Sequence, residues 1–165
     1  MWQELTSQLT DTPWTAIQET TIANANVPHA NAAHAGRQPD GILHNPSTNT
    51  WILYDFTRTS GYTSNDLHAA HDRKLETYAD LMQDLRTTSL NATFLFFPIV
   101  ASFTGAIEEV VWTEAFQTPF APPNPKVVRK IMITGMTQLL VGTDTMATTR
   151  HKAKKIEPPQ HASRP

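Results

Sequence analysis

The segment from Trp51 to Arg58 reads WILYDFTR and constrains the fold more than any other part of the chain. Its first four residues are all apolar, so a strand built from them carries apolar side chains on both faces. A strand of that kind is usually central in its sheet and covered on both sides. Asp55 interrupts this run, and an unpaired buried carboxylate costs several kcal/mol. The sequence therefore predicts a metal or a cationic partner beside Asp55.

The segments around this strand predict an α/β domain. Residues 41–44 form a short strand, joined to it by the turn-rich segment HNPSTN. Residues 91–102 form a second apolar strand, in which Pro98 indicates an edge or a bulge. Trp14–Ile22 is also expected to be a strand. Apolar spacing and capping residues predict helices over residues 2–9, 64–86, 105–116 and 125–147.

Composition narrows the class of protein. A chain of 165 residues can bury the core of one domain. We expect that domain over residues 1–149, followed by a basic, proline-containing disordered tail over residues 150–165. The absence of cysteine excludes disulfides and thiolate metal sites, and no apolar run is long enough to span a membrane. We expect an intracellular protein, whose basic run RHKAKK could be a nuclear import signal, a nucleic-acid contact or a solubilising end.

Three residues in this frame carry the candidate chemistry: Asp40, Asp55 and Lys74. Asp40 precedes the short strand, Asp55 lies at the end of the buried strand, and Lys74 falls within the apolar stripe of the following helix. A lysine on a packing face needs a specific partner, and a pair of carboxylates is the obvious one. Two carboxylates suit a hard divalent cation, while a lysine can offset charge on a phosphate. The pattern therefore predicts metal-assisted cleavage of phosphodiester bonds.

Other acidic and histidine side chains are weaker candidates. Glu4 or Glu19 could supply a further acid to the site. His29 and His34 could be metal ligands, but no cysteine or carboxylate accompanies them, so we expect solvated loop residues. The glutamates at positions 108, 109 and 114 are expected to form a solvated helix face rather than a catalytic pair.

The order of these motifs resembles the restriction-like endonuclease domain of site-specific non-LTR retrotransposons, which belongs to the PD-(D/E)xK nuclease superfamily. The match runs from residue 38 to residue 105. It comprises Pro39-Asp40, the hairpin, Asp55-Phe56-Thr57, the helix segment HDRKLETY, and an apolar strand leading into a small-residue turn. Thr57 stands where the superfamily usually has a lysine. In the retrotransposon domain a helix lysine is thought to replace it, and Lys74 matches that lysine.

The resemblance implies a fold, an activity and a ligand set. The fold is a restriction-endonuclease-like core with a mixed central β-sheet flanked by helices. The activity is that of a divalent-metal-dependent DNA endonuclease, with Asp40, Asp55 and the Phe56 carbonyl holding Mg²⁺ or Mn²⁺. Lys74 would act on the attacking water, and Thr57 could hydrogen-bond a metal-bound water. No small-molecule cofactor and no membrane are implied, and a homodimer stays open. The arginines expected at the DNA backbone are Arg37, Arg58 and Arg73.

Two other functions stay open. One is a relative that has lost catalysis and serves as a nucleic-acid-binding or protein-interaction module. Thr57 in place of the usual lysine favours it, as does a net charge of −2, which gives no global nucleic-acid footprint. The other is a structural α/β domain with Asp40 in an ordinary turn. The pair of acids and the lysine on the buried helix face argue for the enzyme.

Overall fold

The computed structural model describes residues 2–29, 31–61, 63–120, 126–127, 129–130, 133–134 and 137. Along the chain these form α1 (Trp2–Ser7), β1 (Thr15–Gln18), the 3₁₀ turn η1 (Ala32–His34), β2 (Gly41–Asn45), β3 (Thr50–Thr59), α2 (Ser64–Thr88), β4 (Thr93–Ser102) and α3 (Glu109–Gln117). Seven residues of the helix predicted over 125–147 are described, and all seven are helical. The predicted boundary near residue 149 and the predicted tail lie outside the described residues.

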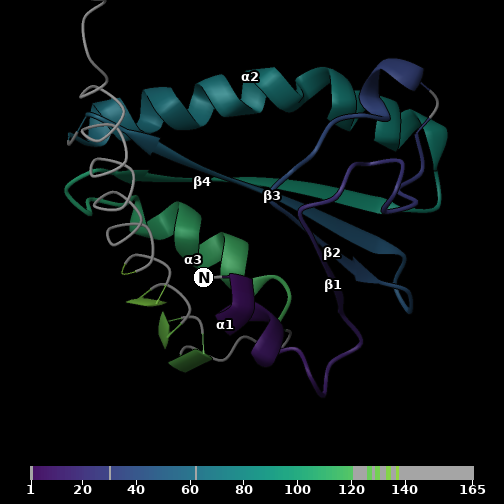
Figure 1. The fold of residues 1–165 in the computed structure, drawn as a ribbon, viewed down its shortest axis with the longest axis horizontal. Coiled ribbons are helices and arrows are strands. Elements are labelled where there is room, and N and C mark those ends of the chain that lie inside the picture. Colours follow the sequence, from purple (N-terminus) through teal and green to yellow (C-terminus); the bar gives the residue numbers. More distant parts are fainter. Residues whose placement is uncertain are drawn as a thin grey trace, which may run out of the picture.

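The strands form one mixed sheet in the order β1-β2-β3-β4, as Figure 1 shows. The β1/β2 and β2/β3 pairs are antiparallel, whereas β3 and β4 are parallel. Antiparallel neighbours need only a tight turn between them, whereas parallel neighbours need a long crossover, which α2 supplies here. The predicted mixed α/β architecture, with helices flanking the sheet, is confirmed.

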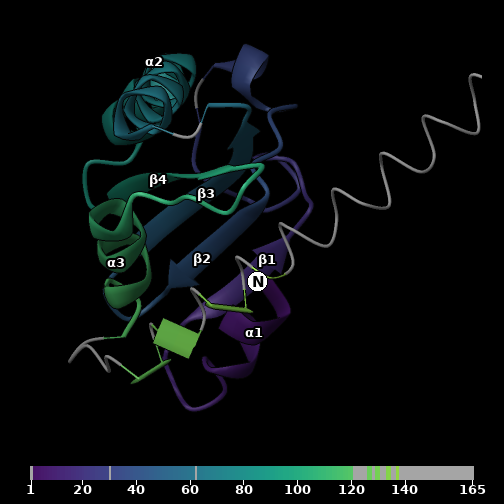
Figure 2. The same ribbon diagram turned by 90° about the vertical axis from the view of Figure 1, so that its left-hand side faces the viewer.

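The helices form a layer on each face of the sheet (Figures 1 and 2). Helix α2 covers one face, where Trp51 and Leu53 pack with its buried side chains. Helices α1 and α3 cover the other face, where Ile52 and Tyr54 pack with Phe116. Strand β3 is therefore buried on both sides, as its apolar run predicts.

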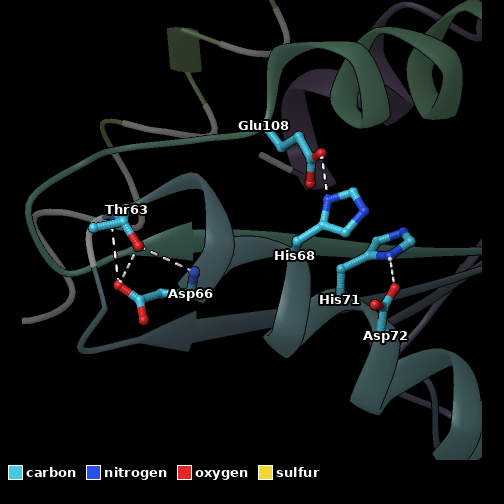
Figure 3. A network of polar contacts seen from close by, with 6 residues as sticks. All are labelled: Thr63, Asp66, His68, His71, Asp72 and Glu108. Atoms are coloured by element: carbon cyan, nitrogen blue, oxygen red, sulfur yellow. Dashed lines mark hydrogen bonds and ion pairs between the residues drawn. The ribbon is translucent and has the colours of Figure 1, made fainter.

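Helix α2 begins at Ser64, as predicted, and ends at Thr88, two residues beyond the predicted end. Its N-cap is Thr63, whose hydroxyl accepts the Asp66 N–H, while the Asp66 carboxylate accepts the Thr63 N–H. This reciprocal capping box satisfies two backbone donors that the helix leaves unpaired. One turn further on, His68 Nδ1 lies 2.8 Å from Glu108 Oε1 and connects α2 to the N-cap of α3 (Figure 3). Glu108 was expected on a solvated face and is instead half-buried in this contact.

Helix α3 begins later than predicted, at Glu109 rather than near residue 105. The preceding residues turn back on β4, where Ile107 forms a bridge with Ala101. The delay rotates the buried face of the helix. The apolar spacing that predicts this helix places Val110 on its buried side, but Val110 is 69% exposed and Trp112 is fully buried.

The first strand is shorter than predicted and ends at Gln18. It ends there because Glu19 has a φ of 48°, in the left-handed region that breaks an extended strand. Ile22, expected within the strand, belongs to the apolar cluster beneath α2, and its N–H donates to the Arg37 carbonyl at 2.8 Å. Among the described residues, no helix has the length and apolar character needed to cross a membrane.

Candidate active site

The candidate site lies where β2 stops and β3 continues. The β2/β3 ladder ends at the pair Gly41 and Tyr54, whereas β3 stays paired with β4 as far as Thr59. From residue 55 onward, no described strand pairs with the β2 side of β3. Asp55 is therefore not at the end of the strand, as the sequence suggested, but inside it. Its side chain leaves from the α2 face, as Leu53 does, and the residue is 7% exposed.

Asp40 lies at the start of this open edge, just before β2. Its carboxylate Oδ2 accepts the Phe56 N–H at 2.6 Å, where the next strand pair would otherwise supply an acceptor. Asp40 as a residue is exposed, but the carboxyl loses solvent where it lies against β3. This desolvation, the hydrogen bond to Asp55 and the charge of Asp55 raise the pKa of Asp40 to about 6. The Phe56 N–H and the charge of Lys74 act in the opposite direction and lower this pKa. The two carboxyl groups are therefore close neighbours.

Lys74 forms an ion pair with Asp55, its Nζ lying 2.6 Å from Asp55 Oδ2. Lys74 lies one turn before the buried Tyr78 on α2, so its stem reaches the sheet face along the apolar stripe. The lysine side chain is 29% exposed and the aspartate side chain 10%, so the pair sits at the edge of the core. The predicted position of Lys74 beside Asp55 is confirmed. Arg73, the alternative cation, is exposed and forms no ion pair with any described residue.

Tyr78 and Arg37 complete the cluster, and the sequence assigned neither of them to the acids. Burial first, and then the charges of Asp55 and Asp40 together with a hydrogen bond to Asp55, raise the pKa of the Tyr78 hydroxyl. The Arg37 guanidinium lies 5.7 Å from the centre of the Tyr78 ring and donates to the Thr77 carbonyl at 2.8 Å. The spacing of Tyr78 from Lys74 on one helix stripe was the available signal. The sequence gives no such signal for Arg37, because Arg37 and Tyr78 are 41 residues apart and meet only in the folded chain.

Thr57, Arg58 and Arg73 lie together beside Lys74. With Thr59, Ala70 and Thr77 they line a hollow of about 120 Å³ between β3 and α2. Thr57 leaves β3 from the same face as Asp55. Arg37 was grouped with Arg58 and Arg73 as a contact for nucleic acid, but it does not line this hollow and packs on Tyr78 instead.

The acids are compatible with a divalent cation that keeps much of its water. Magnesium typically takes one or two protein carboxylates and retains several waters. Asp55 pairs with Lys74, Asp40 accepts the Phe56 N–H, and the two carboxyl groups lie beside each other. The Phe56 carbonyl faces the same open edge as its N–H, because both polar groups of a strand residue point the same way. The described residues contain no cluster of three or more acidic, histidine or cysteine ligands, so water would have to fill most of the coordination sphere.

The other candidate acids and histidines do not join this cluster. Glu19 is exposed and its carboxylate accepts a hydrogen bond from the neighbouring Gln18. The side chain of Glu4 lies outside the described residues. His34 is buried rather than solvated, at 6% exposure, and its Nδ1 has no partner among the described residues. His29 is half-buried, with Nδ1 at 2.8 Å from the Val27 carbonyl.

Comparisons with known proteins add distant likenesses among solved structures. No protein-family model and no curated protein matches the chain. Among solved structures, the Toscana virus cap-snatching endonuclease is similar, with a TM-score of 0.42 and 17% sequence identity. The match covers 80% of this chain and 64% of the viral chain, so this chain spans less than two thirds of that protein. The residues of this chain therefore carry the proposal of a function.

Proposed function

We propose that this protein is a divalent-metal-dependent endonuclease that hydrolyses phosphodiester bonds. The observation that carries the proposal is the meeting of Asp40, Asp55 and Lys74 at the open edge of β3. Asp40 lies just before β2, Asp55 on β3 and Lys74 on α2, and the two acids are close neighbours. Neighbouring carboxylates repel each other, and a bound cation offsets that repulsion.

The residues have distinct roles in this proposal. Asp40 and Asp55 would hold Mg²⁺ or Mn²⁺, with the Phe56 carbonyl at the same edge. The ion supplies Lewis acidity and a more acidic bound water. Lys74 pairs with Asp55 and has further N–H donors for a phosphate oxygen or the attacking water. Tyr78 limits the water around the pair, and Thr57 can hydrogen-bond a water on the metal.

The proposed substrate is DNA. The motif order shared with retrotransposon restriction-like endonucleases supports it, as does the absence of any acidic residue from the lining of the hollow beside Lys74. A relation to that family, a homodimer and import into the nucleus are further proposals. Light scattering of the purified protein tests the dimer, and a reporter fused to residues 150–165 tests the import signal.

Plasmid cleavage tests the enzyme. Supercoiled plasmid is incubated with the protein in Mg²⁺, Mn²⁺ or EDTA, and nicked and linear products are measured. We expect cleavage that requires the metal and that is abolished in Asp55→Asn. This variant also leaves the Lys74 ammonium without a charged partner, so we expect a loss of about 1–3 kcal/mol in the free energy of unfolding.

The control is Asp80→Asn, an exposed carboxylate further along α2. It should cut as the wild type does and unfold at the same temperature. Two results would overturn the proposed endonuclease activity. One is wild-type protein that cuts nothing in Mn²⁺, and the other is an Asp55→Asn variant that cuts as well as the wild type.

The second candidate is a catalytically silent relative that binds nucleic acid or a protein. One observation favours it: each acid already has a protein partner, Lys74 for Asp55 and the Phe56 N–H for Asp40. Thr57 in the position of the usual lysine points the same way. Metal-independent DNA binding without cleavage in the same assay would select this function.

A further inference from the structure

The hollow between β3 and α2 has a basic and hydroxyl-rich lining. Arg73 and Lys74 of α2 line it with three threonines, Ala70 and Arg58, and no acidic residue lines it. The Arg58 side chain leaves β3 from the face opposite to Asp55 and Thr57, so the positive charge of the hollow comes from α2. Asp55 lies behind Lys74, which neutralises it. The hollow therefore combines positive charge with hydroxyl donors, the chemistry that favours an oxyanion.

Arg73 is available to a ligand in this hollow. It is exposed on α2, lines the hollow and forms no ion pair with a described residue. Its guanidinium group is always charged and matches phosphate geometry in a bidentate fashion.

The size of the hollow also suits a phosphate group. The volume of about 120 Å³ equals about four waters at ~30 Å³ each, which is enough for a tetrahedral anion.

We propose that this hollow is a subsite for a phosphate group of the nucleic-acid backbone, next to the phosphate that is cleaved. The proposal rests on the proposed function for its place in a reaction, but its binding chemistry does not need catalysis. Lys74 belongs to both the acid cluster and the hollow, so the two phosphates would be neighbours. Arg73 is the main anchor of this subsite, and its role is positioning.

The test is binding of a fluorescent DNA duplex in EDTA, measured by anisotropy between 50 and 200 mM NaCl. Each backbone phosphate neutralised contributes about −0.9 to the slope of log K against log salt. Arg73→Gln should therefore reduce the slope by about 0.9 and weaken binding several-fold. The matched control is Arg86→Gln, an exposed arginine on the same helix, 13 residues away or about 20 Å along the axis. It should leave the slope unchanged.

A second arm separates the nucleic-acid backbone from free anion. Inorganic phosphate is titrated while the unfolding temperature is followed for wild type, Arg73→Gln and Arg86→Gln. A rise lost only in Arg73→Gln, together with the slope change, supports the subsite. A phosphate effect without a slope change would assign the hollow to a free anion and overturn the backbone proposal. Equal slopes for both variants would overturn it too, even in a protein that cuts plasmid. A slope change in a protein that cuts nothing would keep the subsite and remove only the endonuclease.

Discussion

The Asp40 side chain has two roles. One oxygen caps the Phe56 N–H at the end of the β2/β3 ladder, and the group as a whole sits beside Asp55. The first role is structural and would be met by an amide as well as by a carboxylate. The second is electrostatic and unfavourable unless a cation is present. Substitution by asparagine separates the two roles.

Asp40→Asn should stabilise the metal-free protein at neutral pH. The folded chain raises the pKa of Asp40 to about 6, so this group adds stability below about pH 4 and that stability is lost as pH rises through 6. The amide keeps an acceptor for Phe56 and has no charge to lose. After solvent screening we expect about 1 kcal/mol at pH 7.5, or about 2–4 °C in Tm.

Thermal unfolding in EDTA from pH 4 to pH 8 checks this. The advantage of Asp40→Asn over the wild type should shrink toward pH 4. Asp40→Ala, which removes the acceptor as well, should not show the gain. A pH-independent difference would mean that Asp40 titrates normally.

Lys74→Ala should affect chemistry more than binding. A group that contacts charge developing in the transition state acts on rate, and one such donor is worth about 10²–10³-fold. We expect a fall of that size in the single-turnover cleavage rate, well beyond the several-fold loss of DNA affinity in EDTA that follows from removing one charge from the hollow. Lys74→Arg should not restore the rate, because a planar fork is not a compact ammonium. Equal losses of rate and affinity would instead make Lys74 a simple backbone contact.

At the scale of elements, α2 is the part that assembles the site. Its stripe brings Lys74 to Asp55, and Tyr78 follows one turn later under Arg37. The helix is long and well capped, so these side chains sit on a rigid frame. Its placement over the parallel pair β3 and β4 follows from the crossover that joins them.

Thr63→Ala should therefore lower stability without changing the chemistry. Loss of the capping hydroxyl typically removes about 1 kcal/mol. Chemical denaturation should report that loss, while the cleavage rate of the folded protein stays constant. Thr87→Ala is the control, because its hydroxyl bonds helix carbonyls at the exposed far end and should matter by less than about 0.5 kcal/mol. A cleavage defect in Thr63→Ala would show that the cap also positions Lys74.

At the scale of the whole molecule, the two layers are joined through buried polar contacts as well as apolar ones. The Tyr54 hydroxyl donates to the Ala115 carbonyl at 2.8 Å, and Trp112 Nε1 donates to the Val100 carbonyl at 2.9 Å. The Trp112 bond also occupies a carbonyl on the unpaired edge of β4, the edge strand of the described sheet. Together with Pro98, which has no N–H, it makes that edge a poor template for another strand.

Tyr54→Phe should destabilise the fold while preserving its shape. The Ala115 carbonyl lies in the last turn of α3, where it has no partner within the helix. Without the hydroxyl it is buried and unsatisfied, at about 1–3 kcal/mol. Urea denaturation should show a lower midpoint with an unchanged m-value. An unchanged midpoint would mean that another donor reaches this carbonyl.

Local sequence patterns alone determined that the sheet is covered on both faces, and they identified the three residues of the candidate site. An apolar run on both faces of β3 requires cover on both sides, whatever supplies it. A lysine within an apolar helical stripe requires an acid nearby, and Asp55 was the buried acid in reach. These deductions hold because strand and helix periodicity are properties of the backbone.

Only the tertiary structure decided the details that depend on where elements begin and which distant segments meet. The late start of α3 exposed Val110 and buried Trp112, because a bridge between Ala101 and Ile107 used the preceding residues. The Asp40 cap on Phe56 exists because β2 ends earlier than β3. Arg37 reaches Tyr78 because a long loop folds back on α2, and no local periodicity encodes that closure.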